Sequence, residues 1–228
     1  MTYSWVLFDA DGTLFDYDKA EASALRQAFA QIGRPYDRSY IEVYRQINGR
    51  IWRDLEQGRI SPERLRTRRF ELLFDALRIA LDPQMFSKVY LQQLAMRSDL
   101  MEGAQDAVSA LYGRVGMVIA TNGLADVQRP RFCGSAIYPF FQDIVISEEV
   151  GAAKPDAAFF DAAFARMGGP PRTAVLIVGD SLTSDMRGGA AYGIDTCWFN
   201  PNRLPCDPAS RIQYQIERLG ELAGIPGV

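Results

Sequence analysis

The spacing of apolar and polar residues divides the chain into two kinds of pattern. Five short apolar runs have the length of buried strands: WVLF (5–8), VGMVIA (115–120), DIVIS (143–147), AVLIVGD (174–180) and IDTCWF (194–199). Runs of this kind, separated by segments with helical periodicity, are typical of parallel strands that are buried on both faces. The pattern therefore predicts an α/β fold with a doubly wound, Rossmann-like parallel sheet.

About eighty residues between the first and second of these runs have only helical periodicity. Apolar residues recur there every three or four positions in four segments, which begin near Asp18, Tyr40, Pro62 and Pro83. Ser61, just before Pro62, is typical of an N-cap. We therefore expect a core domain of residues 1–14 and 98–228, with a four-helix cap domain of residues 15–97 inserted into it.

Composition restricts the class of protein. The chain has 228 residues, of which 48% are hydrophobic and 23% are charged, and its net charge is −3. These values are ordinary for a soluble globular protein and do not favour a nucleic-acid partner. No apolar run approaches the roughly 18 residues of a membrane span, and no signal-peptide pattern is present. We expect a cytoplasmic location, no membrane partner and no obligate protein partner.

Histidine is absent from the chain. This absence excludes Ser-His-Asp triads, Cys-His dyads, phosphohistidine intermediates and most zinc hydrolase sites. The three cysteines include no C-x-x-C pair, so we expect free thiols in a reducing compartment. Any chemistry must depend on carboxylates, Lys, Ser or Thr side chains and a metal ion.

Polar residues follow four of the predicted strands at the points where they end. In chain order they are Asp9 and Asp11, then Thr121 and Asn122, then Lys154, then Asp180 and Asp185. Ligands of open α/β sheets bind beyond the carboxyl ends of the strands, so we expect these side chains to share one site. Hard oxygen ligands without imidazole favour Mg²⁺, which also offsets the repulsion between neighbouring carboxylates.

Such a site can carry out phosphoryl transfer. Asp9 can attack a phosphate ester and form an aspartyl phosphate, while Asp11 can protonate the leaving oxygen and later activate water. Lys154 and the Thr121 hydroxyl can neutralise the other phosphoryl oxygens and donate hydrogen bonds to them. We expect the substrate phosphate to be bound by Asp11, Gly12, Thr121, Asn122 and Lys154.

Four motifs in this order resemble those of the haloacid dehalogenase (HAD) superfamily of phosphatases: FDADGT, ATNG, AAKPD and VGDSLTSD. The resemblance implies a phosphoric monoester hydrolase for a small phosphate ester, with an α-helical cap between the first two motifs. It also implies Mg²⁺ held by Asp9, the backbone carbonyl of Asp11, and Asp180, with Asp185 in support; which of Asp180 and Asp185 binds directly stays open. The name-giving dehalogenases are disfavoured because they lack a carboxylate at the position of Asp11.

Four longer stretches are most similar to the house-cleaning pyrimidine 5′-nucleotidases, which act on nucleoside monophosphates. They are SEEVGAAKPD, ATNGLADVQRPR, GDSLTSDMRGGAAYGIDTCWFNP and IWRDLEQGRIS. One departure is Gly12, where that subgroup often has Glu. In the predicted cap, Tyr44, Trp52 and Phe70 are more typical of a helical interior than of a surface that stacks on a base.

The leading prediction is a Mg²⁺-dependent 5′-nucleotidase for pyrimidine nucleoside monophosphates. The same motifs also serve sugar-phosphate and phosphoglycolate phosphatases and phosphomutases. A phospho-accepting signalling module of the receiver type also has an acidic pocket, a Thr and a Lys on a doubly wound sheet. Its acceptor lies later in the chain than Asp9, however, and a cap would obstruct the docking of a partner. A short-lived aspartyl phosphate would indicate an enzyme, and a stable one would indicate a switch.

Overall fold

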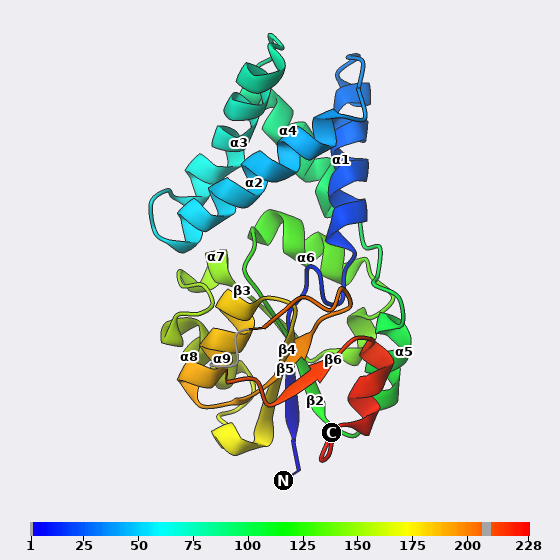
Figure 1. Ribbon diagram of the computed structural model, residues 1–228, viewed down its shortest axis with the longest axis vertical. Coiled ribbons are helices and arrows are strands. Elements are labelled where there is room, and N and C mark those ends of the chain that lie inside the picture. The colour runs from blue at the N-terminus through cyan, green and yellow to red at the C-terminus, as the bar shows by residue number, and fades with distance from the viewer. Residues whose placement is uncertain (1, 207–210) are drawn as a thin grey trace. The chain divides into compact units, whose positions relative to one another are not determined.

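The computed structural model describes residues 2–206 and 211–228 and contains a six-stranded parallel sheet (Figure 1). The chain divides into a core unit, Met1–Tyr17 with Ser98–Val228, and a helical unit, Asp18–Arg97. The core unit contains the whole sheet. Among the described residues, none of the helices has both the length and the apolar character that a membrane crossing requires.

The strands confirm the predicted fold class. They are β1 (Trp5–Phe8), β2 (Gly116–Thr121), β3 (Asp143–Ile146), β4 (Val175–Gly179), β5 (Asp195–Phe199) and β6 (Tyr214–Ile216). The first five match the predicted apolar runs, whereas β6, only three residues long, was not expected. The order in the sheet is β3-β2-β1-β4-β5-β6. This is the Rossmann order, whereas receiver-type sheets follow the order 2-1-3-4-5, so the topology argues against a receiver module.

Helices cover both faces of the sheet (Figure 1). The helices of the core unit are α5 (Ala104–Leu111), α6 (Ala125–Cys133), α7 (Ser147–Val150), α8 (Ala157–Arg166) and α9 (Arg187–Tyr192). Shorter helical turns are η1 (Tyr138–Phe140), η2 (Arg172–Ala174), η3 (Leu182–Met186) and η4 (Leu219–Gly224).

Successive residues of a strand point to opposite faces of the sheet. In β1, Val6 and Phe8 pack with α5, α6 and η4, whereas Leu7 packs with α8 and α9. Both faces are therefore buried, as the continuous apolar runs predict.

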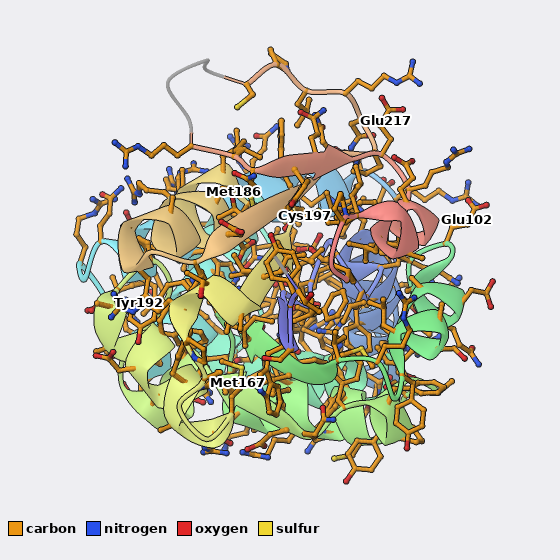
Figure 2. The ribbon with its side chains drawn as sticks, turned by 90° about the horizontal axis from the view of Figure 1, so that it is seen from below. Glu102, Met167, Met186, Tyr192, Cys197 and Glu217 are labelled. Atoms are coloured by element: carbon orange, nitrogen blue, oxygen red, sulfur yellow. The ribbon has the colours of Figure 1, made fainter. Side chains whose placement is uncertain are left out.

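Cys197 of β5 lies among packed side chains between the layers, whereas Glu102 lies at the periphery (Figure 2). Burial raises the pKa of the Cys197 thiol to about 12. The thiol therefore stays protonated near neutral pH and acts as a small apolar side chain.

The helical unit contains the four helices that the sequence predicts. They are α1 (Tyr17–Gln31), α2 (Tyr40–Glu56), α3 (Pro62–Leu77) and α4 (Pro83–Ala95). Ser61 is the N-cap of α3, because its side chain accepts a hydrogen bond from the Arg64 N–H (3.2 Å). Tyr44 and Phe70 are fully buried and stack on each other, with ring centroids 5.6 Å apart. They belong to the interior, as predicted, and Trp52 is half-buried.

A buried polar cluster interrupts this aromatic interior. Glu21 accepts hydrogen bonds from Arg45 Nε and Asn48 Nδ2, each at 3.1 Å. Asn48 Oδ1 in turn accepts one from the guanidinium of Arg69 (3.2 Å), which also lies against the ring of Tyr90. Burial raises the pKa of Glu21 to about 7, although the bonds from Arg45 and Asn48 act to lower it. The helical unit therefore contains a carboxyl group that titrates near neutral pH.

This titration predicts a pH-dependent stability. The pKa of Glu21 rises from 4.5 in the unfolded chain to about 7 in the folded one. Its contribution to stability is therefore full below pH ~4.5 and is lost as the pH rises through ~7. A shift of this size corresponds to a loss on the order of 3 kcal/mol. We expect the unfolding free energy of the wild type, relative to Glu21→Gln, to fall by this amount between pH ~4.5 and ~8 in urea titrations.

An exposed carboxylate gives the control for this experiment. Hydrogen bonds from Ser39 lower the pKa of Asp37. The unfolding free energy of the wild type, relative to Asp37→Asn, should therefore change only in the acidic range, where it should rise with pH and not fall. A constant difference between the wild type and Glu21→Gln over the whole range would contradict the raised pKa of Glu21.

Candidate functional site

The loop after β1 holds the first two predicted site residues. The N–H of Asp9 donates to the carbonyl oxygen of Val178 (2.8 Å), which fixes Asp9 beside the end of β4. The loop then closes on itself, because the N–H of Phe15 donates to the carbonyl oxygen of Ala10 (2.8 Å). Asp9 and Asp11 are therefore held by a tight turn at the carboxyl end of the sheet, between β1 and β4, where the strand order reverses.

Lys154 lies at the centre of the site, with a side chain that is 1% exposed. Its ammonium donates to Asp9 Oδ1 (2.7 Å), Asp185 Oδ1 (2.6 Å) and the carbonyl oxygen of Ala120 (2.5 Å). All three donors of the ammonium are thus used. Burial alone lowers the pKa of Lys154, but the carboxylates of Asp185 and Asp9 outweigh it and raise the pKa above its ordinary value. Lys154 is therefore a permanent positive charge.

Asn122 holds the main chain of Lys154. Its Oδ1 accepts a hydrogen bond from the Lys154 N–H (2.8 Å), and its Nδ2 donates to the Lys154 carbonyl oxygen (2.9 Å). The side chain of Asn122 thus joins the end of β2 to the segment that carries the lysine. Contact between Asn122 and a substrate phosphate stays a prediction.

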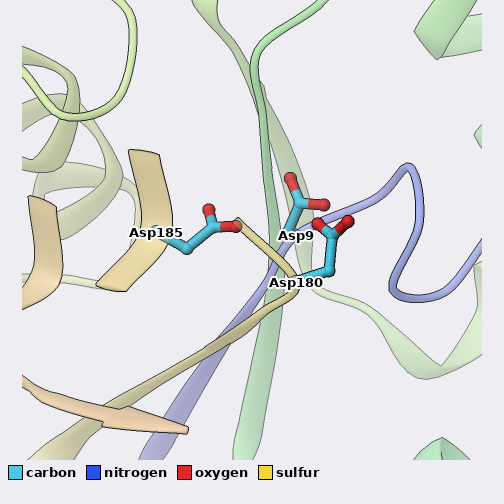
Figure 3. Close-up of side chains that lie close together, drawn as sticks. All are labelled: Asp9, Asp180 and Asp185. Carbon is cyan, nitrogen blue, oxygen red and sulfur yellow. The ribbon is translucent and has the colours of Figure 1, made fainter. Parts of the chain in front are cut away.

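Asp9, Asp180 and Asp185 form a carboxylate cluster (Figure 3). One oxygen atom from each of them lies within 4.8 Å of the other two. Burial raises the pKa of Asp9 well above its usual range, although Lys154 acts to lower it. Asp180 is more exposed than the other two, but desolvation within the site still raises its pKa to about 7, and the negative charge of Asp185 adds to this effect. Lys154 alone therefore does not compensate the negative charge of the cluster.

The donor set of this cluster fits a divalent cation. The cluster has three carboxylates, two of which bind the one ammonium, and all the available ligand atoms are hard oxygens, which Mg²⁺ prefers. Within residues 2–206 and 211–228, no other group of acidic or cysteine side chains has this spacing. The cluster is therefore the candidate metal centre of the described chain.

Two glycines allow the carboxylates to lie this close to the backbone. Gly12 has a φ of +85°, and a Cβ at this position would lie 2.5 Å from Oδ2 of Asp180. A Cβ on Gly179 would lie 2.3 Å from Oδ2 of Asp185. A side chain at either position would displace one of the carboxylates.

Asp11 has different partners from Asp9, and both lie on α6. Gln128 Nε2 donates to Asp11 Oδ2 (2.6 Å), and the guanidinium of Arg131 donates to Asp11 Oδ1 (2.6 Å). Gln128 Nε2 also lies 3.1 Å from the hydroxyl oxygen of Thr121. The roles of Gln128 and Arg131 were not predicted from the sequence, because such residues usually face solvent on a helix. The one available signal is their spacing of three, which places them on the same helix face.

Comparisons with known proteins agree with this arrangement. A family profile described as haloacid dehalogenase-like hydrolase matches residues 3–193. The pyrimidine 5′-nucleotidase PynA of Streptococcus pneumoniae is 35% identical over 95% of this chain and 92% of its own length. The pyrimidine 5′-nucleotidase YjjG of Escherichia coli is 34% identical over 97% of both chains.

A third relative is similar to this chain both in sequence and in a solved structure. The HAD-hydrolase YfnB of Bacillus subtilis is 36% identical over 96% of this chain and 94% of its own length. A crystal structure of YfnB bound to magnesium matches the whole of both chains, with a TM-score of 0.92 at 35% identity.

The steric constraint at Gly12 gives a prediction for cation binding. In Gly12→Ala the new Cβ displaces the Asp180 carboxylate, so the affinity for Mg²⁺ should fall by about 10- to 100-fold. Calorimetric titration with Mg²⁺ measures this change. Gly113→Ala is the matched control, because Gly113 has a φ of +79° but no atom within 4 Å of the added Cβ. Equal affinities in the two variants would contradict a role for Gly12 in placing Asp180.

Proposed function

This chain belongs to the family of haloacid dehalogenase-like hydrolases, and we propose that it is a Mg²⁺-dependent phosphomonoesterase for pyrimidine nucleoside 5′-monophosphates. The observation that carries the proposal is the different bonding of two carboxylates on one loop. Asp9 is bonded to Lys154 inside the acidic cluster, whereas Asp11 is bonded to Arg131 and Gln128. This difference supports Asp9 as the nucleophile and Asp11 as the group that exchanges a proton.

The reaction takes place in two halves. The Asp9 carboxylate attacks phosphorus, the bond from phosphorus to the alcohol oxygen breaks, and Asp11 gives its proton to that oxygen. In the second half, Asp11 takes a proton from the water that attacks the aspartyl phosphate, and inorganic phosphate leaves Asp9. The hydroxyl of Thr121 donates a hydrogen bond to a phosphoryl oxygen that does not react, and Lys154, whose three donors are bonded within the protein, neutralises the phosphoryl group by its positive charge.

Mg²⁺ would be held by Asp9, Asp180 and the main-chain carbonyl of Asp11, where it supplies positive charge that keeps Asp9 ionised and neutralises the phosphate. The bonding of Asp185 supports Asp180 as the direct ligand. Oδ1 of Asp185 accepts from Lys154, and Oδ2 accepts from the N–H of Ser181 (3.2 Å). Both oxygens of Asp185 thus accept hydrogen bonds from the protein, which favours a supporting role in which Asp185 holds Lys154 in place.

A substitution of Asp9 tests the nucleophile. Asp9→Asn keeps the size of the side chain but removes the attacking charge, so phosphate release should fall by at least about a thousandfold. Asp106→Asn, on the exposed face of α5, is the control and should keep full activity. Mass spectrometry of the intact protein excludes deamidation back to Asp. Substantial turnover by undeamidated Asp9→Asn would disprove the assignment.

A substrate panel tests the specificity. Phosphate release is measured with UMP, dTMP, AMP, GMP, sugar phosphates, phosphoglycolate and p-nitrophenyl phosphate, with Mg²⁺ and with EDTA. We expect kcat/KM to be at least about tenfold higher for UMP and dTMP than for the purine nucleotides, and activity to be lost in EDTA. If a purine nucleotide or a sugar phosphate is the better substrate, the nucleotidase assignment fails and the phosphomonoesterase remains.

A further inference from the structure

We propose that Arg131 and Gln128 are positioning residues that fix the orientation of Asp11 for proton exchange with the leaving group. The inference rests on the proposed phosphomonoesterase function and concerns residues that neither the motifs nor the comparisons identify.

Helix α6 exposes one arginine and buries another. Arg129 lies on the outside and forms an ion pair with Glu149. Arg131 and Gln128 are 1% and 4% exposed. Burial of a guanidinium or an amide is costly unless its polar atoms find partners. The contacts that Arg131 and Gln128 make are therefore specific features of this helix face.

The hydrogen bonds between these residues have only one possible direction. A guanidinium has donors and no acceptor. The contact of Arg131 with Gln128 Oε1 (3.0 Å) therefore fixes the amide with its oxygen toward the arginine. The amide NH₂ must then point the other way, where Asp11 Oδ2 lies at 2.6 Å and Thr121 Oγ1 at 3.1 Å.

This direction determines the roles of both neighbours. Asp11 accepts one hydrogen bond at each oxygen, from Arg131 and from Gln128, which restricts rotation of its carboxylate. The hydroxyl of Thr121 accepts from Gln128, so its single hydrogen remains available for another acceptor, such as a phosphoryl oxygen. One amide therefore orients the Asp11 carboxyl group and leaves the hydroxyl hydrogen of Thr121 available as a donor.

Aromatic contacts hold Arg131 beside the loop that carries Asp11. Its guanidinium carbon lies 5.2 Å from the ring centroid of Phe15 and 5.9 Å from that of Tyr17. These distances are within the range of cation–π attraction. Arg131 is thus fixed on two sides, by α6 and by residues that follow the loop. General acid catalysis requires an acid within hydrogen-bond reach of the leaving oxygen. A small displacement of Asp11 therefore lowers the rate at which the leaving group is protonated.

The test separates positioning of Asp11 from a merely structural role. Arg131→Met and Gln128→Met remove the polar groups but keep most of the volume. For each variant, kcat/KM is measured with p-nitrophenyl phosphate and with the alkyl phosphate that the wild type hydrolyses best. kcat/KM covers the steps up to departure of the leaving group, and p-nitrophenolate leaves without a proton. We expect a loss of about 100-fold on the alkyl ester and of less than about tenfold on the aryl ester.

Two further variants complete the design. Arg129→Met, two positions away on the exposed side, should leave both rates unchanged. In an Asp11→Asn background, Arg131→Met should cause no additional loss on the alkyl ester, because the group that it positions is already absent. Gln128→Met retains Arg131, and we expect the same difference between the two esters for it. If a thermal melt shows that Arg131→Met does not fold, Gln128→Met still tests the proposal.

Some results would overturn the proposal. Equal losses on the two esters would show that Arg131 and Gln128 do not act through the proton of the leaving group, and additive losses in the Asp11→Asn background would show that they act independently of Asp11. A wild type that hydrolyses no phosphate ester would overturn the proposed function itself, and the inference with it. That failure is visible before any variant is made.

Discussion

The site depends on one buried ammonium group. Lys154 binds carboxylates from the loop after β1 and from η3, together with a carbonyl oxygen of β2, so it joins the carboxyl ends of three neighbouring strands. If a neutral side chain replaced it, Asp9 and Asp185 would face each other in a poorly solvated space. Uncompensated buried charges of this kind cost about 3–5 kcal/mol. The same contact therefore assembles the acidic cluster and stabilises the end of the sheet.

Several neighbouring residues hold Lys154 and the carboxylates of the cluster in place. Asn122 holds the main chain of Lys154, and Gly179 leaves space for Asp185. The indole N–H of Trp198 donates to the carbonyl oxygen of Asp180 (2.8 Å), which fixes the start of the loop after β4. These supports come from three different strands. The positions of the carboxylates thus follow from the sheet and change little with any single loop.

The sequence predicts the parts of the structure that follow from local patterns. The four helices of the helical unit and the first five strands have strong periodicity and clear capping or breaking residues such as Ser61 and Gly33. The carboxyl ends of parallel strands lie at the same edge of a sheet. The positions of Asp9, Lys154 and Asp185 after predicted strands were therefore enough to predict that they lie together. The strand β6 has only three residues and becomes a strand by pairing with β5.

The sequence could not predict interactions that depend on tertiary burial. The spacing of three from Gln128 places Arg131, unlike Arg129, on the same helix face as Gln128, but it does not show that this face is the buried one. The decisive difference is which face of α6 is buried by tertiary packing, and no short sequence pattern encodes it. The partners of Asp11 are therefore visible only in three dimensions, although Asp11 itself was found from its motif.

The central position of β1 has a consequence for biosynthesis. This strand is the first part of the sheet to leave the ribosome, but its partners begin at Gly116 and Val175. In the sequence, the helical unit follows β1 and precedes Gly116. Its contacts join helices that are close in the chain, such as α2 with α3 and α3 with α4. Local contacts form sooner than distant ones, so we expect the helical unit to fold first. Until residue 175 is made, β1 has an unpaired apolar edge, and a chain interrupted before that point is prone to aggregate however well its helices have folded.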